Sequence, residues 1–404
     1  MNGLFLFSFI NIGFVLSLRH GTFSKVLRLV GGANSDASDW PQTGNPHILI
    51  TGGAGYIGTH TIVCLLQAGY DVTVVDNLVN ANEESLRRVR AITECHPSRL
   101  RFYNADLLSM GPLEEVFKSS PPFAACIHFA GLKAVGESVQ KPLLYYENNL
   151  ISTFNLLKLM DKYDCKSIVF SSSATVYGSA AVPITESTQA GLGITNPYGR
   201  TKYMIEEILK DFRVANPDWS IVILRYFNPV GSHPSGVIGE DPNGIPNNLM
   251  PFVSQVAVGR RPHLTVFGND WPTPDGTGVR DYIHVMDLSE GHVAALKYAE
   301  RKSDSKTPAS KAGFQKYSVF NLGTGHGESV LDMVKAMEGA SGKKLPLQFG
   351  PRREGDIAIC YADPAAAKEQ LGWTATRSLG DMCRDLWKWQ SSNPNGYDTK
   401  NKQV

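Results

Sequence analysis

Cysteine is scarce in this sequence. The chain has 404 residues and six cysteines, which form no CxxC pair and no Cys/His metal spacing. A disulfide framework and a metal site are therefore not expected, and a reducing, cytoplasmic compartment is favoured. The sequence also has almost no excess of charge of either sign, because its 39 Lys and Arg residues are balanced by 38 Asp and Glu residues. With a net charge of +1, the chain has no overall field that would attract nucleic acid or an anionic membrane, so local groups must hold any anionic ligand.

A long apolar run is missing as well. The only candidate, residues 3–18, is shorter than the roughly 20 residues that span a bilayer, and no Lys or Arg precedes it as in a signal peptide. We interpret it as a misassigned start or a weak membrane anchor. Residues 19–45 are rich in Gly, Ser, Asp and Pro and are expected to be a linker, so that 1–45 form an extension. A Lys-rich stretch at 301–316 predicts a surface loop, and 393–404 a tail.

The body of the chain has the pattern of a parallel sheet covered by helices. The composition, 42% hydrophobic and 19% charged, is typical of a globular protein. From residue 46 onward, short apolar runs alternate with longer segments of helical periodicity. Strands are predicted at 47–51, 71–76, 101–104, 125–129, 167–171 and 220–226, with one more at 317–322. The predicted fold class is α/β: a Rossmann-like doubly wound sheet in residues 46–228, completed by later segments such as 317–322, and a smaller, mainly substrate-binding lobe in 229–392.

A glycine-rich turn follows the first predicted strand. Gly52, Gly55 and Gly58 form a GxxGxxG pattern that leads into an apolar helix. The first glycine allows a tight bend, the second lets backbone N–H groups approach a pyrophosphate, and the third lets the helix pack on the strand. Asp76 ends the second predicted strand, 18 residues after Gly58, where a carboxylate binds ribose hydroxyls. We therefore expect NAD as cofactor, and not NADP, whose 2′-phosphate Asp76 would repel; a purely structural turn is the alternative.

A tyrosine and a lysine lie one turn apart on a predicted helix. Asn196 and Pro197 have the residue types of an N-cap and a first helical position, which places Tyr198 and Lys202 on one face. A phenol is a poor base at neutral pH unless positive charge stabilises the phenolate, and Lys202 and an oxidised nicotinamide ring are expected to supply that charge. Ser173 follows the strand predicted at 167–171 and is expected to share a proton with Tyr198. The Tyr-x3-Lys pair alone also occurs on ordinary helix surfaces, but together with the cofactor turn it predicts catalysis.

Seven longer motifs make the sequence similar to one family. They are TGGAGYIG (51–58), FAGLKAVGES (129–138), SSSATVYG (171–178), NPYG with Lys202 (196–202), LRYFNP (224–229), NNLMP (247–251) and RDYIHV (280–285). Through them the chain resembles the extended short-chain dehydrogenase/reductase superfamily and, within it, the UDP-galactose 4-epimerase family, over residues 48–398. The resemblance implies an isomerase of galactose metabolism that inverts C4 of UDP-galactose and UDP-glucose through a 4-keto sugar, with NAD kept bound. It also implies a homodimer.

The same resemblance implies two sets of binding residues. The NAD contacts are Gly52, Gly55, Tyr56, Ile57, Gly58, Asp76, Asn77, Asp106, Leu107, Phe129, Lys133, Asn149, Tyr198, Lys202 and Phe227. The UDP-sugar contacts are Ser173, Asn228, Asn247, Asn248, Leu249, Thr265, Phe267, Arg280, Tyr282, Arg353, Asp356 and Cys360. Arg280 and Arg353 suit a diphosphate, because a guanidinium group binds two phosphate oxygens at once.

Some of these residues have a structural alternative. Asp106 and the pair Asn247-Asn248 have the residue types of helix caps, and Lys133 that of a plain surface lysine. An arginine taken alone more often forms a surface salt bridge. Cys360 matches a family position at the sugar pocket, where a small residue implies turnover of UDP-GalNAc and UDP-GlcNAc as well; otherwise it is a small buried apolar residue.

Two other functions share part of this pattern. A nucleotide-sugar 4,6-dehydratase has an Asp-Glu pair after the hydroxyl at the strand end, where this chain has Ala174 and Thr175, so the acid and base for water loss are missing. A catalytically inactive NAD-binding module would lack the tyrosine or the lysine, and both are present.

Overall fold

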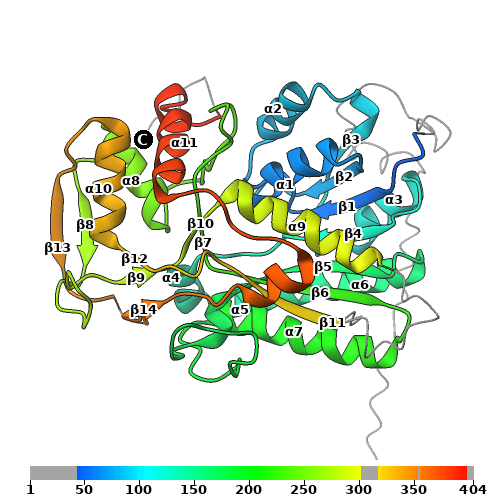
Figure 1. Ribbon diagram of the computed structural model, residues 1–404. Helices are drawn as coiled ribbons and strands as arrows, with labels where there is room; N and C mark the ends of the chain where they lie inside the picture. Colours follow the sequence, from blue (N-terminus) through cyan, green and yellow to red (C-terminus); the bar gives the residue numbers. More distant parts are fainter. Residues whose placement is uncertain (1–42, 302–316, 354, 398–404) are drawn as a thin grey trace, which may run out of the picture.

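A seven-stranded parallel sheet forms the centre of the molecule (Figure 1). The structure is a computed structural model that describes residues 43–301, 317–353 and 355–397. The strands lie in the order β11-β6-β5-β4-β1-β2-β3. They are β1 (His47–Thr51), β2 (Asp71–Asp76), β3 (Leu100–Asn104), β4 (Ala125–His128), β5 (Ser167–Ser173), β6 (Ser220–Tyr226) and β11 (Tyr317–Leu322). The predicted α/β fold with a Rossmann-like doubly wound sheet is confirmed.

The strands are apolar because helices cover both faces of the sheet. Every residue of β1, β2 and β4 is buried, which explains their continuous apolar runs. β1, β2, β6 and β11 have the predicted bounds, and the other three differ by one or two residues at one end. β5 continues to Ser173 because Ser172 and Ser173 pair with Arg225 and Tyr226 of β6.

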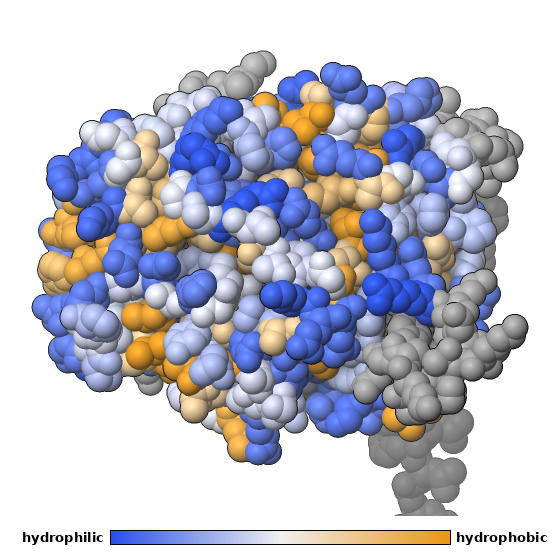
Figure 2. Space-filling view, in the orientation of Figure 1, coloured by the Kyte–Doolittle hydropathy of each residue, from blue (hydrophilic) through white to orange (hydrophobic). Residues whose placement is uncertain are grey.

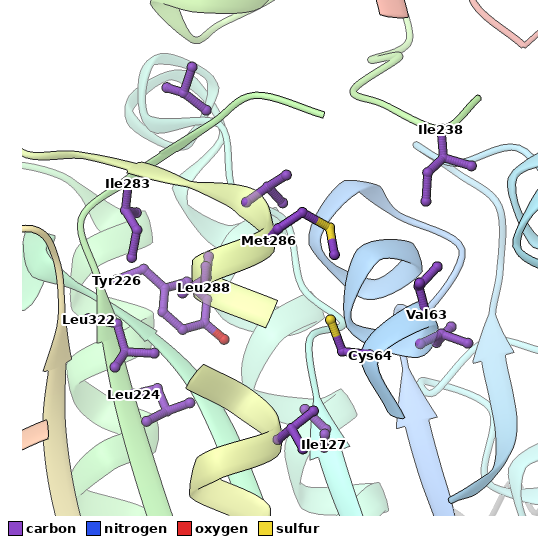
Figure 3. Packing of buried hydrophobic residues seen from close by; sticks show 14 of the residues in the cluster. Val63, Cys64, Ile127, Leu224, Tyr226, Ile238, Ile283, Met286, Leu288 and Leu322 are labelled. Carbon is purple, nitrogen blue, oxygen red and sulfur yellow. The ribbon is translucent and has the colours of Figure 1, made fainter. Parts of the chain in front are cut away.

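Two apolar cores lie on the two faces, since successive strand residues point to opposite sides. Ile48 and Ile50 of β1 belong to the core beneath α1 and α9, and Leu49 to the core beneath α3, α6 and α7. Figure 3 shows side chains of α1 and α9, among them Cys64 and Met286, packed in the first core. The helices around the sheet are α1 (Tyr56–Gln67), α2 (Glu84–Thr93), α3 (Met110–Ser119), α4 (Val135–Gln140), α5 (Pro142–Tyr146), α6 (Ser152–Lys162), α7 (Pro197–Ala215) and α9 (Val285–Glu300). The short helical turns in the described part of the chain are η2 (Pro97–Arg99), η3 (Glu147–Ile151), η4 (Ala174–Tyr177) and η5 (Ala367–Leu371).

A smaller lobe stands beside the carboxyl ends of the strands, at the left of Figure 1. It holds the parallel pair β7 (Asn228–Val230) and β10 (Tyr282–His284), the pair β8 (Leu264–Phe267) and β13 (Leu347–Gly350), and the sheet β12 (Glu328–Ser329), β9 (Val279–Arg280) and β14 (Ile359–Cys360). Its helices are α8 (Leu249–Ala257), α10 (Val330–Ser341) and α11 (Leu379–Ser392). The chain returns to the large sheet with α9 and β11, so the two lobes are connected more than once. The division near residue 228 stays a prediction.

Several predictions concern segments outside the described residues. These are the apolar stretch 3–18, the linker up to residue 42, the stretch 302–316 and the last residues from 398. Among the residues that the structure describes, no helix is both long and apolar enough to cross a membrane. Figure 2 shows a face on which apolar residues are interspersed among polar ones.

Candidate active site

The turn between β1 and α1 requires its glycines. Gly52 has φ +70°, and a Cβ there would lie 2.6 Å from the backbone nitrogen of Ala130. At Gly58 a Cβ would lie 2.7 Å from the carbonyl oxygen of Gly52. Gly55 takes the N-cap position of α1, and no side chain caps the helix there. The first N–H groups of α1 are therefore available to an anion, which fits the pyrophosphate of a dinucleotide.

Asp76, at the end of β2, holds this turn in place. Its carboxylate accepts hydrogen bonds from the backbone N–H of Ala54 at 3.0 Å and of Leu78 at 2.9 Å. Burial raises the pKa of Asp76, and these hydrogen bonds oppose the rise. The sequence predicts Asp76 as a ribose ligand; the structure adds that the same carboxylate shapes the glycine-rich turn.

The next predicted contacts lie along the same edge of the sheet. The amide of Asn77 donates to Asp106 at 3.0 Å, and the other carboxylate oxygen of Asp106 accepts from the backbone of Leu108 at 2.8 Å. The helix-cap alternative for Asp106 is wrong, because Ser109 occupies the N-cap position of α3. Leu107, beside Asp106, is buried.

A second group of predicted cofactor contacts surrounds the end of β4. Asn149 is buried and its amide donates to Leu132 at 3.1 Å and to Thr201 at 3.0 Å, which ties the turn after β4 to α7. Lys133 is exposed and its ammonium lies 3.4 Å from Glu240, an ion pair that fits a surface lysine as well as a cofactor ligand. The remaining members, Tyr56, Ile57, Phe129 and Phe227, are partly or fully buried in the described structure.

The helix that carries Tyr198 and Lys202 begins as predicted. Asn196 is the N-cap of α7, and its side-chain oxygen accepts from the N–H of Gly199 at 2.8 Å, with Pro197 in the first turn. Lys202 is 4% exposed, and its ammonium donates to the carbonyl of Ser171 at 2.6 Å. The same ammonium lies 6.0 Å from the centre of the Tyr198 ring. The predicted one-turn spacing therefore brings both groups to the carboxyl end of β5.

Burial dominates the electrostatics of these groups. It raises the pKa of Tyr198, and a hydrogen bond with Ser173 opposes this rise. It lowers the pKa of Lys202 to about 8, against the effect of Glu206. The protein groups alone therefore do not make the phenol acidic, because desolvation of Tyr198 outweighs the opposing hydrogen bond with Ser173. Ser173 also accepts from the hydroxyl of Thr175 at 3.0 Å, which orients its side chain.

The predicted UDP-sugar residues gather in the smaller lobe. Arg280 of β9 is the register partner of Cys360 in β14, and Asn228 of β7 that of Tyr282 in β10. Burial raises the pKa of Tyr282 to about 12, and the charges of Arg280 and Arg353 oppose the rise.

Other members of this set are less enclosed. Arg353 forms a paired contact with Asp356, at 3.0 and 3.1 Å, and stacks 5.3 Å from the ring of Phe267, which follows Thr265 on β8. The contact between Arg353 and Asp356 is the kind of surface salt bridge that is the alternative to a phosphate ligand at this arginine. Asn248 is the N-cap residue of α8, which begins at Leu249, and Asn247 precedes it. The Asn248 side chain makes no capping hydrogen bond.

A buried group near the site was not predicted. Glu206 on α7 pairs with Arg225 on β6, and the hydroxyl of Ser172 donates to the same carboxylate. Two signals were present in the sequence: Glu206 lies four residues after Lys202, and Arg225 interrupts an apolar strand, where a charge needs a partner.

The comparisons with known proteins place the chain in a broad family of sugar-nucleotide enzymes and, through its relatives, in one branch of it. A family model described as GDP-mannose 4,6 dehydratase matches residues 49–386. UDP-glucose 4-epimerase of Bacillus subtilis is 59% identical over 351 residues, 87% of this chain and 98% of that protein. The chain belongs to the UDP-glucose 4-epimerase family. The UDP-glucose 4-epimerase of Homo sapiens is 54% identical over 360 residues, which cover 87% of this chain and 99% of the human protein.

A solved structure of the family supports the fold and the cofactor. The UDP-glucose 4-epimerase of Bifidobacterium longum in complex with NAD+ and UDP has a TM-score of 0.81 and 51% identity, over 87% of this chain and 99% of that one. The predicted membership of the UDP-galactose 4-epimerase branch of the short-chain dehydrogenase/reductase superfamily is confirmed.

Proposed function

We propose that this protein is an NAD-dependent isomerase that interconverts UDP-galactose and UDP-glucose through a transient 4-keto sugar. The observation that carries the proposal is the meeting of two sites at the carboxyl edge of the large sheet. Tyr198, Lys202 and Ser173 lie at the carboxyl end of β5, two strands along the sheet from β1 and its glycine-rich turn. Cys360 of β14, the register partner of Arg280, packs in one apolar cluster with Val176 and Tyr177 of η4, the turn that follows Ser173. Membership of the 4-epimerase family supports the same reaction.

The residues present fit NAD. The uncapped N-terminus of α1 takes the pyrophosphate, and the Asp76 carboxylate binds the ribose hydroxyls and repels the negative charge of a 2′-phosphate. When bound, oxidised NAD supplies positive charge that favours the Tyr198 phenolate and a ring that accepts the C4 hydride and returns it. An equilibrium preference for NADP over NAD would contradict the role of Asp76.

Tyr198 moves the proton in this proposal. Its phenolate takes the proton of the sugar 4-hydroxyl, with Ser173 bridging, while the hydrogen on C4 leaves with its electron pair and the C4–O bond becomes double. After the keto sugar turns its other face, hydride returns to C4 and Tyr198 gives its proton back to the oxygen. The hydrogen bond between Tyr198 and Ser173 and the cap of α7 hold the base in position for both steps.

A direct test follows the hydrogen on C4. The protein is incubated with UDP-galactose tritiated at C4, and UDP-glucose is detected with a UDP-glucose dehydrogenase. We expect UDP-glucose that keeps the tritium, because the hydride never leaves the site. Loss of tritium to solvent or to free coenzyme would refute the mechanism. A product lacking one water would indicate a 4,6-dehydratase, and no turnover an inactive NAD-binding module.

We also propose that N-acetylated substrates are accepted. Cys360 is small and 8% exposed, and it lies in register with Arg280, at the wall of the predicted sugar pocket. A small side chain at this wall leaves room for the acetamido group. The check is turnover of UDP-GalNAc beside UDP-galactose; activity on UDP-galactose alone would remove this claim and leave Cys360 as a small buried apolar residue.

A homodimer in the cytoplasm is the state that we propose. Leu144, Ile151 and Phe154 form an exposed apolar stripe along α5, η3 and α6, and Met204 on neighbouring α7 is exposed as well. Such a patch fits a second copy of the chain. Phe154→Glu should convert the dimer to a monomer in light scattering, and a wild-type monomer would contradict the proposal. The six cysteines, all without disulfides, fit a reducing compartment, which fractionation of the host cell would test.

A further inference from the structure

A buried ion pair lies directly behind the candidate catalytic residues. Glu206 on α7 is 2% exposed and Arg225 on β6 is 6% exposed. Arg225 donates to the two carboxylate oxygens of Glu206 at 3.0 and 2.6 Å. Ser172, the residue before Ser173, donates its hydroxyl to the same carboxylate. Glu206 is thus fixed by two different strands of the sheet.

One further N–H group of the arginine is held as well. Arg225 donates from Nη1 to the hydroxyl of Tyr177 at 2.8 Å, and Tyr177 in turn donates to Asn321 at 2.7 Å. Tyr177 and Asn321 are both buried. Because every member is bound, the network has one arrangement, and the carboxylate of Glu206 has a fixed direction.

Fold stability alone does not account for this pair. Two charges lose several kcal/mol each when they leave water, and apolar packing of the same size is often as stable. The position of Glu206 is more informative. It lies four residues after Lys202, on the same face of α7, with its carboxylate in the layer between α7 and the strands that carry Ser173.

Glu206 is the carboxylate that acts on Lys202. Burial lowers the pKa of Lys202 to about 8, and the charge of Glu206 works in the opposite direction. The ammonium otherwise meets neutral groups, the carbonyl of Ser171 and the ring of Phe170 at 4.9 Å.

Other titratable groups around Lys202 do not replace this charge. His128 on β4 is neutral, because burial lowers its pKa to about 3. Tyr226 on β6 is neutral, because burial raises its pKa. Tyr198, on α7 itself, is the group that Lys202 assists, and Arg225 is itself a cation.

We propose that Glu206 is a positioning residue of the reaction: its carboxylate keeps Lys202 protonated at neutral pH and, through Ser172, fixes the strand end that carries Ser173. The inference rests on the proposed function, because Lys202 and Ser173 serve Tyr198 in that reaction. Glu206 acts through these neighbours and does not touch the substrate.

The test is the pH profile of kcat for Glu206→Gln. Without the carboxylate, Lys202 loses the charge that opposes its desolvation, so it deprotonates at lower pH. We expect the alkaline limb of the profile to move to lower pH by about one unit or more, since a nearby opposite charge shifts a pKa by that amount. KM for UDP-galactose should stay within about twofold, because Glu206 does not bind the sugar nucleotide.

Two further variants separate charge from folding. Glu206→Gln leaves Arg225 buried without its partner, which can unfold the protein. The double variant Glu206→Gln with Arg225→Met removes both charges. The alkaline limb of its kcat profile should still lie at lower pH than that of the wild type. Glu207→Gln is the matched control, since Glu207 is the next residue of α7, its side chain is 48% exposed, and it lies 3.7 Å from Lys210. Its profile should coincide with the wild type.

A titration of Lys202 without turnover keeps this inference separate from the proposed function. The NMR signal of selectively labelled Lys202 in the NAD-loaded protein should titrate at lower pH in both Glu206 variants. If the titration and the profile coincide with those of the wild type, Glu206 is only structural and the inference is wrong. If the Lys202 titration moves but no variant and no wild type epimerises UDP-galactose, the charge effect stands and the proposed function is wrong.

Discussion

The substitution Tyr198→Phe removes one oxygen atom from the centre of the proposed mechanism. The ring keeps its place on α7, whose cap by Asn196 is unchanged. The hydroxyl of Ser173 loses its hydrogen bond with Tyr198 but keeps its contacts with the backbone and hydroxyl of Thr175. A lost hydrogen bond of this kind costs about 1 kcal/mol, so the variant should fold and bind NAD.

The effect on turnover should be much larger than the effect on folding. Proton transfer by a positioned side chain contributes about 10²- to 10⁴-fold to a rate, or about 3–5 kcal/mol of the barrier. Lys202 is buried and Tyr198 is only partly exposed, so bulk water is a poor replacement for the positioned base. We therefore expect kcat to fall by about 10³-fold or more, with KM little changed.

The assay compares the variant with a hydroxyl loss elsewhere on the same helix. Turnover of UDP-galactose is measured together with the NAD content of the purified protein and its melting temperature. Tyr203→Phe, one turn and a residue further along α7, is the control and should keep most of the wild-type activity. If Tyr198→Phe is stable, contains NAD and turns over within about tenfold of the wild type, the phenol is not the base and the mechanism is refuted.

Three further changes test other parts of the structure. Cys360→Tyr should narrow the proposed sugar pocket and lower kcat/KM for UDP-GalNAc at least about tenfold relative to UDP-galactose; an unchanged ratio would place Cys360 outside the pocket wall. Trp389→Ala removes a ring that is 1% exposed and whose indole N–H donates to Glu240, so the free energy of unfolding in urea should fall by about 3–5 kcal/mol; a loss below about 1 kcal/mol would contradict this packing. Burial tends to raise the pKa of Asp385, but hydrogen bonds, chiefly from His284, hold this pKa below its usual range. The ionised carboxylate therefore stabilises the folded protein above about pH 4, and this stabilisation is lost as the pH falls through the pKa of the folded state. Asp385→Asn should therefore flatten the acid side of a plot of urea midpoint against pH, and an unchanged slope would show that the carboxylate does not contribute.

The sequence by itself determined the elements whose causes are local. Continuous apolar runs located the strands within one or two residues, because a strand covered on both faces needs apolar side chains at every position. The start of α7 was predictable from Asn196 and Pro197, since a cap is a contact between residues three apart. The turn at Gly52 and Gly58 was predictable too, because a Cβ at either place meets backbone.

Only the tertiary structure decided which distant groups share an environment. Nothing local distinguishes Ser109 from Asp106 as the cap of α3, or shows that Asp76 binds the N–H of Ala54. The pairing of Glu206 with Arg225 joins a helix to a strand and depends on how α7 packs on the sheet. The same holds for the pKa of Tyr198: the sequence pointed to the positive charge of Lys202 and of an oxidised nicotinamide ring, whereas among the protein's own groups burial raises the pKa. Desolvation is set by all the atoms that surround a group, and most of these come from elsewhere in the chain.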